Sequence, residues 1–196
     1  AQGAIDAALK AYQEATEMSP GLATAWNGLA AMHGAKGDLK AAEANFIRAA
    51  EIDPEYASPR LNLGRLYLSR GQLFEAVKHL ENAVLLQPDS MAARESLVQC
   101  LVALEEFSAA EKQLQAMLDL SPDDVNLIGS LGIVAAKQEK FQTAIGYFKQ
   151  LVELDPNETN AIEQLAILHD AVGESDLAAQ YRARLKTLRP EAANSP

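Results

Sequence analysis

Six prolines stand at a constant spacing of 34 residues along the chain: Pro20, Pro54, Pro88, Pro122, Pro156 and Pro190. The sequence has 8 prolines in all, so this one series takes up most of them. A constant period of this size is typical of a solenoid, in which one structural unit recurs along the chain. The period therefore constrains the fold more strongly than the composition does.

Other residues recur in step with the prolines. Twelve residues before each one stands an alanine: Ala8, Ala42, Ala76, Ala110, Ala144 and Ala178. Eight residues before each stands a bulky side chain in five of six cases: Tyr12, Phe46, Leu80, Leu114 and Phe148, with Arg182 in the sixth. A leucine series, at Leu29, Leu63, Leu97, Leu131 and Leu165, keeps the same period. Small and large residues at fixed places predict a pair of closely packed helices in each period.

These residues carry a resemblance to a known family. The closest stretch is Trp26-x2-Leu29-Ala30-x2-His33, followed by Ala42-x3-Phe46 and Pro54. This stretch closely resembles the signature of the tetratricopeptide repeat (TPR). The resemblance covers essentially the whole chain. It implies an all-α fold: a right-handed α-solenoid of antiparallel helix pairs, called a TPR superhelix.

The period divides the chain into a half repeat and five full repeats. The half repeat, residues 1–22, would be the second helix of a truncated repeat, running from Ala4 to about Met18. Repeats one to five are predicted at 23–56, 57–90, 91–124, 125–158 and 159–192, with a tail at 193–196. Glycines at 37, 71 and 173 mark the turn between the two helices in three repeats, because glycine readily takes the left-handed conformation that ends a helix.

The two ends of the array differ in polarity. The first helix lacks a preceding neighbour, so Ile5, Leu9 and Tyr12 are expected to expose apolar surface there. That expectation favours either a fragment of a longer repeat protein or coverage by another chain through self-association. In repeat five, Ser175 and Arg182 replace the apolar residues of the other repeats, which predicts a polar C-terminal cap.

Charge and composition limit the partners. The formal net charge is −10, which disfavours nucleic acid and anionic lipid as general partners. No run approaches the roughly 18 apolar residues of a membrane span, so no membrane insertion is expected. The chain has 1 cysteine, so no intrachain disulfide is expected, whether the compartment is cytoplasmic or the protein is exported.

No motif indicates catalysis, a metal or a cofactor. His33 and His169 share one slot in repeats one and five, too far apart in a solenoid to bind one ion. Cys100 takes an apolar helix position and has no histidine in its repeat, which indicates a buried thiol rather than a nucleophile. A basic run at Arg182, Arg184, Lys186 and Arg189 either complements a helix dipole or docks an acidic partner.

The family resemblance implies that the first helices of the pairs line a concave groove that binds partners. The residues carried over to this groove are mostly small and neutral, with hydroxyls and amides that suit the backbone of an extended peptide. The alternative is that they are ordinary solvated positions. The partner-binding residues predicted in this way are Asn27, Asn62, Arg65, Ser96, Gln99, Asn126, Ser130, Lys137 and Gln164.

Several functions follow from this interpretation. The first is a non-catalytic scaffold that binds a protein or peptide ligand, centred on repeats two to four, with an acidic ligand group near Arg65. The alternatives are a docking or regulatory module of a larger enzyme, and a self-assembling array. A clamp for a peptide's terminal carboxylate is not expected, because Ala31, Ala92 and Ser96 stand where that clamp has asparagine, lysine and arginine.

Overall fold

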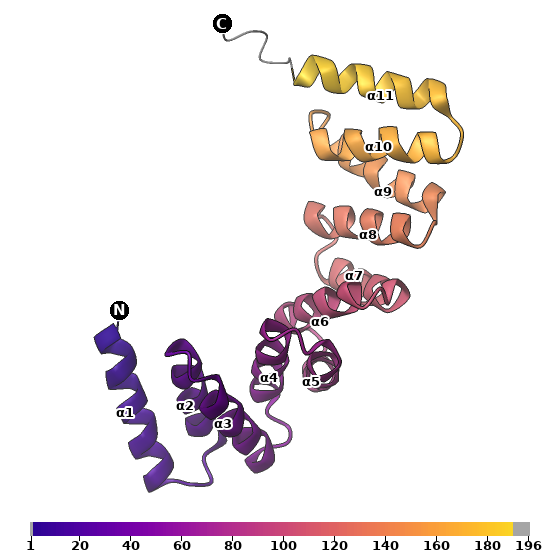
Figure 1. Cartoon of the computed structure of the whole chain (residues 1–196). Helices are drawn as coiled ribbons and strands as arrows, with labels where there is room; N and C mark the ends of the chain where they lie inside the picture. The colour runs from indigo at the N-terminus through magenta and orange to yellow at the C-terminus, as the bar shows by residue number, and fades with distance from the viewer. Residues whose placement is uncertain (1, 190–196) are drawn as a thin grey trace, which may run out of the picture. The chain divides into compact units, whose positions relative to one another are not determined.

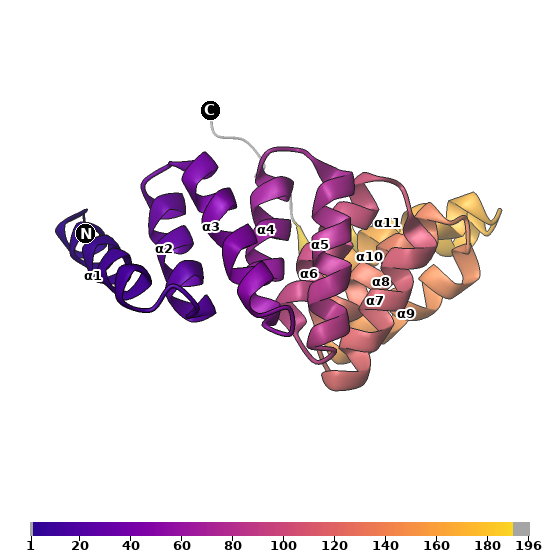
Figure 2. The same cartoon turned by 90° about the horizontal axis from the view of Figure 1, so that it is seen from below.

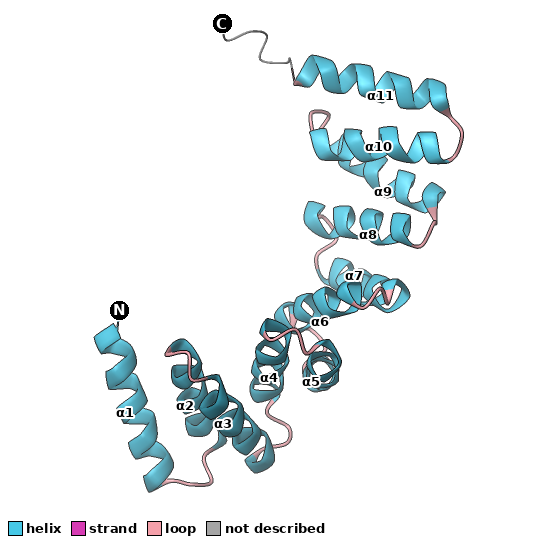
Figure 3. Ribbon diagram, in the orientation of Figure 1, coloured by secondary structure: helices cyan, strands magenta, loops and turns pink. Residues whose placement is uncertain are grey.

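The computed structural model describes residues 2–189, which form eleven helices and no strand (Figure 3). The predicted tail at 193–196 lies outside the described residues. In chain order (Figure 1) the helices are α1 (Gln2–Met18), α2 (Ala23–Ala35), α3 (Leu39–Ile52), α4 (Ala57–Ser69), α5 (Leu73–Leu86), α6 (Met91–Ala103), α7 (Phe107–Leu120), α8 (Val125–Lys137), α9 (Phe141–Leu154), α10 (Thr159–Ala171) and α11 (Ser175–Leu188).

The helices pack as consecutive antiparallel pairs, such as α2 with α3 and α4 with α5 (Figure 2). The first helix of each pair has 13 residues and the second has 14. The chain divides into two compact units, with the boundary between Leu104 and Glu105. The described part of the chain is thus an all-α solenoid of helix pairs, which confirms the predicted fold class.

The periodic prolines end the second helices by restricting the residue before them. Asp53, Gln87, Ser121 and Asp155 precede prolines and end α3, α5, α7 and α9, and each leaves the helical region, with φ between −130° and −140° and positive ψ. A residue before proline avoids the helical region, because the proline ring clashes with its backbone. The proline series therefore acts through local sterics at the end of each pair.

The turns inside the pairs all need a left-handed residue, but only some use glycine. Gly37, Gly71 and Gly173 have φ of 83°, 71° and 81°. The same position in the other two pairs holds Glu105 and Glu139, with φ of 60° and 58°. An L-residue in this region is strained, because its Cβ approaches the following carbonyl oxygen. The two glutamate turns therefore have the same backbone geometry as the glycine turns, but with conformational strain at the glutamate.

Small residues let paired helices approach closely, as the alternation of residue sizes predicts. A Cβ added to Gly64 of α4 would lie 2.4 Å from Leu80 Cγ, and one added to Gly132 of α8 would lie 2.9 Å from Phe148 Cε2. Both contacts are closer than ordinary van der Waals packing allows. In these two pairs, Leu80 and Phe148 therefore fill the space that the glycine of the first helix leaves.

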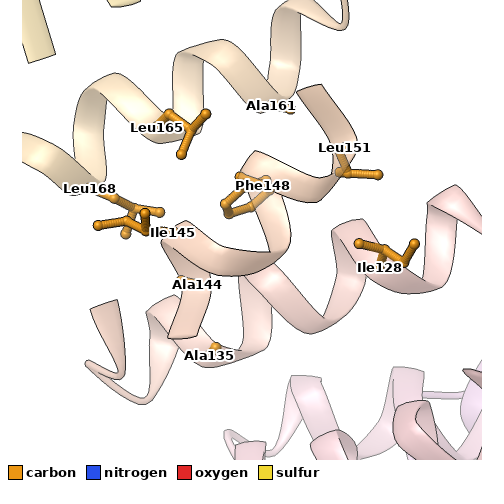
Figure 4. Packing of buried hydrophobic residues seen from close by; sticks show 9 residues of the cluster. All are labelled: Ile128, Ala135, Ala144, Ile145, Phe148, Leu151, Ala161, Leu165 and Leu168. Carbon is orange, nitrogen blue, oxygen red and sulfur yellow. The ribbon is translucent and has the colours of Figure 1, made fainter. Parts of the chain in front are cut away.

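Each compact unit has its own core. In the first, a cluster of Ala30, Ala42, Phe46 and Leu63 joins α2, α3 and α4. In the second, side chains of α8, α9 and α10 converge around Phe148 (Figure 4). Ile128, Leu165 and Leu168 belong to this second cluster and are at most 3% exposed. The first helix of one pair thus packs on the second helix of the pair before it, as a solenoid requires.

The two ends of the array show how far the expected polarity holds. On α1, Ile5 and Leu9 are half-buried rather than exposed, so the expectation of a bare apolar face was wrong for these two. The reason is that α1 packs on α2. Tyr12 is 37% exposed, and its ring lies over Gly28. At the other end, Ala178 is the one residue of α11 that is fully buried, and Leu177 of the same helix is 39% exposed.

Candidate functional site

The first helices of the pairs are α2, α4 and α6 in the first compact unit and α8 and α10 in the second, and the surface that they present within each unit is here called its first-helix face. In the first unit, α4 contacts both α2 and α6. Asn62 of α4 donates from Nδ2 to Oδ1 of Asn27 on α2, at 3.1 Å. Asn27 donates in turn to the Tyr56 hydroxyl, at 3.3 Å. The two predicted asparagines therefore form one hydrogen-bonded chain, and each amide is fixed in orientation.

A second polar contact joins α4 to α6. Arg65 Nε donates to Ser96 Oγ at 3.2 Å, while the Ser96 hydroxyl donates to the Ala92 carbonyl at 2.9 Å. Ser96 is only 5% exposed, so this predicted residue acts by positioning Arg65 rather than by facing a ligand. Arg65 itself is exposed, and its bond to Ser96 uses Nε, so its two terminal nitrogens can donate to an acidic group. Gln99, one turn beyond Ser96, is exposed too.

In the second unit, α8 and α10 flank a pocket of about 360 Å³, here called the α8–α10 pocket. Its rim includes three predicted residues, Asn126 and Ser130 from α8 and Gln164 from α10. The Ser130 hydroxyl donates to the Asn126 carbonyl at 2.8 Å. The structure thus places three of the predicted polar side chains around one cavity.

The apolar part of this pocket was missed. Phe148 and Leu151 of α9 line it, as do the half-exposed side chains of Val125 and Ile133. Phe148 and Leu151 are 3% and 8% exposed and fill the periodic positions of core residues, so nothing in the pattern marks them as pocket-lining residues. The sequence feature that could have indicated this apolar surface is Gly129, because it has no side chain to cover it.

Lys137, also predicted to bind the partner, is exposed at the C-terminal end of α8 and lies outside the lining of the pocket. No ion pair of Lys137 is present among residues 2–189. A cation at a helix C-terminus is favoured by the helix dipole. Its place in the structure is explained by that local effect without a ligand.

A network of charged and aromatic side chains joins the first two full helix pairs. Glu43 of α3 accepts from the Tyr67 hydroxyl at 2.6 Å and from Arg70, which also donates to the Leu39 carbonyl. The hydrogen bond from Tyr67, followed by that from Arg70, lowers the pKa of Glu43. The bond to Glu43 raises the pKa of Tyr67 to about 12. This network ties neighbouring repeats together and contributes no reactive group.

A similar tie lies in the second unit. Glu111 of α7 accepts from Lys140 at 2.7 Å and from Gln138 at 2.9 Å. The hydrogen bond from Lys140, followed by that from Gln138, lowers the pKa of Glu111. Both donors belong to the turn between α8 and α9. The carboxylate therefore holds the turn of one pair against the second helix of the preceding pair.

The histidines and the cysteine serve packing. His169 is 2% exposed, contacts Glu174 at 2.6 Å through Nδ1 and stacks on Tyr181. His79 stacks on Tyr67, and burial lowers its pKa. Cys100 is fully buried, and burial raises the pKa of its thiol, which confirms the predicted packing role. Between residues 2 and 189, no group of three His, Cys, Asp or Glu side chains could bind a metal ion.

Most of the basic run near the C-terminus is engaged within the chain. Arg182 pairs with Asp170, and Arg184 donates to the Pro156 carbonyl. Arg189 pairs with Glu163 at 3.4 Å and donates to the Thr159 hydroxyl at 2.9 Å. These contacts favour a structural role for the run in holding α11 on α10. In the described part of the chain, no helix has both the length and the apolar character needed to cross a bilayer.

Tandem antiparallel helix pairs, with small residues between paired helices and a proline after each pair, define a helical repeat scaffold. A family model described as the TPR domain of cytochrome c-type biogenesis protein H matches residues 53–162, more than half of the chain. A second model, described as a tetratricopeptide repeat, matches residues 1–57. The chain therefore belongs to the TPR family, as its signature residues predict. No curated relative matches it in sequence.

Solved structures share the fold at low sequence identity. YrrB, described as a TPR protein with an unusual peptide-binding site, aligns with a TM-score of 0.81 at 21% identity, over 94% of this chain and 95% of YrrB. A crystal structure of MamA aligns with a TM-score of 0.75 at 22% identity, over 89% and 98% of the two chains. A MamA fragment from Desulfovibrio magneticus RS-1 gives a TM-score of 0.71 at 18% identity, over 88% and 97%. These similarities establish the fold alone.

Proposed function

We propose that this protein is a non-catalytic scaffold that binds a partner peptide on its first-helix face. The α8–α10 pocket carries the proposal, because it combines an apolar floor with polar side chains at its rim. Ligand sites are typically concave and mostly apolar, with a few polar groups that fix orientation. Asn126 and Gln164 can each donate to and accept from a peptide backbone.

The first compact unit supports the same function with different chemistry. Asn27, Asn62 and Arg65 are held by hydrogen bonds to their neighbours before any ligand arrives. Side chains that are already ordered lose less conformational entropy on binding. The exposed terminal nitrogens of Arg65 match a carboxylate, since a guanidinium can donate two parallel hydrogen bonds. We therefore expect an acidic group of the ligand at Arg65.

The shared fold adds independent support. YrrB is described as a peptide-binding TPR protein, so a solenoid of this kind is a suitable scaffold for a peptide. Fold similarity alone does not transfer a ligand, because function depends on the residues of the site. The groups of this chain on the first-helix face therefore have to be tested directly.

A mutational comparison tests the proposal. Peptides selected from a random-sequence library displayed on phage would be measured by fluorescence anisotropy against wild-type protein, Arg65→Ala, Asn62→Ala and Gln99→Ala. Lys78→Ala is the control, because Lys78 is exposed on α5, a second helix. Loss of a hydrogen bond to a charged group costs about 1.5–3 kcal/mol, and loss of a neutral one about 0.5–1.5 kcal/mol.

Arg65→Ala should therefore weaken binding more than Asn62→Ala does, and Lys78→Ala should leave it unchanged. If Lys78→Ala weakens binding while the three first-helix changes do not, the ligand lies on the opposite face. If the library yields no peptide that binds the wild-type protein, peptide binding itself is refuted.

A further inference from the structure

Repeat four differs from the other repeats at one slot of its first helix. The 34-residue period aligns Gly129 with Asn27, Leu61, Glu95 and Glu163. Every other full repeat thus has a side chain where repeat four has none. A Cβ added to Gly129 would lie 3.5 Å from Leu151 Cδ1, which is ordinary contact, so close packing does not require this glycine. The missing side chain instead leaves Leu151, which lines the α8–α10 pocket, without cover from this slot.

Apolar surface also runs along α8 beside the pocket. Val125, Gly129 and Ile133 follow one another at intervals of four residues, which places them on the same side of the helix. Val125 is 49% exposed and Ile133 is 51% exposed, so both offer apolar surface to a ligand. Eight residues of helix rise about 12 Å. An extended peptide covers that length with about four residues, at roughly 3.3 Å each.

The volume of the pocket limits what it can hold. At about 360 Å³ it lies near the lower end of the roughly 300–1,000 Å³ of ligand pockets. An aliphatic side chain together with the peptide backbone on either side of it fits within this space. Asn126 and Gln164 at the rim can then bond the backbone on either side.

The charge at the pocket is negative. Glu158 is the charged residue among those that line it. One of its oxygens, Oε1, accepts from the Asn160 amide at 2.9 Å, which leaves the second oxygen free to accept. Asp124, directly before Val125 and outside the lining, accepts from the Asn126 and Leu127 amides as the cap of α8. The nearby cations Arg184 and Arg189 donate to Pro156, Thr159 and Glu163.

We infer that the α8–α10 pocket is a subsite for an aliphatic side chain of an extended peptide in which a lysine or arginine stands beside that side chain. The inference rests on the proposed peptide-binding function and adds the chemistry of the ligand. Glu158 selects the basic neighbour, and the net charge of −10 draws a basic peptide to the chain. The same net charge disfavours a second copy of this protein as the occupant.

The test fills the pocket without disturbing the core. Gly129→Leu places at this slot the residue that repeat two already has as Leu61, and Gly146→Leu is the matched control. Gly146 is exposed on α9, with nothing near its added Cβ. Ile133→Ser removes an apolar wall from an exposed position and serves as a second variant if Gly129→Leu fails to fold. Glu158→Gln removes the charge and keeps an oxygen to cap α10.

The probes are the peptides that the phage library yields, together with synthetic versions in which the aliphatic residue becomes serine or the basic residue becomes glutamate. We expect the selected sequences to share an aliphatic residue next to lysine or arginine. Gly129→Leu and Ile133→Ser should each weaken binding about tenfold or more, and Gly146→Leu should have no effect. Glu158→Gln should weaken binding several-fold at low salt and less at high salt.

Three results would overturn the inference. Selected peptides that lack this pattern, or that bind Gly129→Leu and Ile133→Ser as tightly as the wild type, would show that the pocket is not the subsite, while peptide binding elsewhere on the face would stand. Dimerisation that Gly129→Leu abolishes, seen by light scattering, would make the occupant a second copy. Absence of any wild-type binder would refute the proposed function and this inference together.

Discussion

Two glycines of the same helix pair, Gly132 and Gly146, should respond in opposite ways to the same substitution. Alanine inside a helix is about 0.5–1 kcal/mol more favourable than glycine. Gly146 is exposed and its added Cβ meets nothing within 4 Å, so Gly146→Ala should gain that amount in the free energy of unfolding.

Gly132→Ala gains the same propensity but forces its Cβ to 2.9 Å from the buried ring of Phe148. Overpacking of this kind costs about 1–3 kcal/mol. Because the propensity gain is common to both variants, their difference in unfolding free energy isolates the packing cost. We therefore expect Gly132→Ala to be about 1–3 kcal/mol less stable than Gly146→Ala.

Urea unfolding followed by far-UV circular dichroism measures this difference, provided the denaturant slope stays constant among the variants. Repeat arrays can unfold in parts, so amide hydrogen exchange in α8 and α9 serves as a local readout. Equal gains in stability for both variants would refute the reasoning, since they would show that α8 and α9 separate without cost to admit a methyl group.

The remaining predictions concern turns, titration and reactivity. Glu139→Gly should raise the unfolding free energy by about 0.5–1 kcal/mol, because relief of about 1–2 kcal/mol of left-handed strain outweighs the entropy of glycine; an unchanged urea midpoint would contradict this. Tyr67 has a pKa raised to about 12, so its hydrogen bond should stabilise the fold below pH 10 or so and lose that effect as pH rises through about 12. In Glu43→Gln, the ultraviolet titration of Tyr67 should shift to lower pH; no shift would show that Glu43 is not the cause. Cys100 should react with thiol reagents only as fast as the protein unfolds, because it is fully buried. Rapid labelling in the native state would contradict that burial.

The spacing of prolines, alanines and leucines predicts the helix pairs well, because each acts through local sterics. The left-handed turns at Glu105 and Glu139 could not be predicted in this way, since glutamate does not by itself favour positive φ. In the second turn, Glu111 accepts from the residues on both sides of Glu139 and so holds that turn in place. Local propensity was overridden by packing.

The candidate site was predictable in part for a similar reason. Polar residues at exposed slots, such as Asn126, can be identified from the helical period alone. Whether a core residue such as Phe148 is accessible from the surface depends on the side chain that covers it. The covering side chain belongs to a different helix, so the period of α9 alone does not show whether Phe148 lines a pocket. For Ile5 and Leu9 the error was in the opposite direction: they were expected to be exposed, but they are half-buried where α1 packs on α2.

The slot shared by Asn27, Leu61, Glu95, Gly129 and Glu163 holds an amide, an aliphatic chain, two carboxylates and no side chain at all, in repeats of identical length. Most of the residues that hold the helices together lie elsewhere, in the proline, alanine and leucine series, although Asn27 and Glu163 also bond to neighbouring elements. The slot whose chemistry varies is therefore largely separate from the positions that pack the helices. A mutation at this slot can change the chemistry offered to a ligand in one repeat while the neighbouring repeats keep theirs, so such a chain can change its partner one repeat at a time.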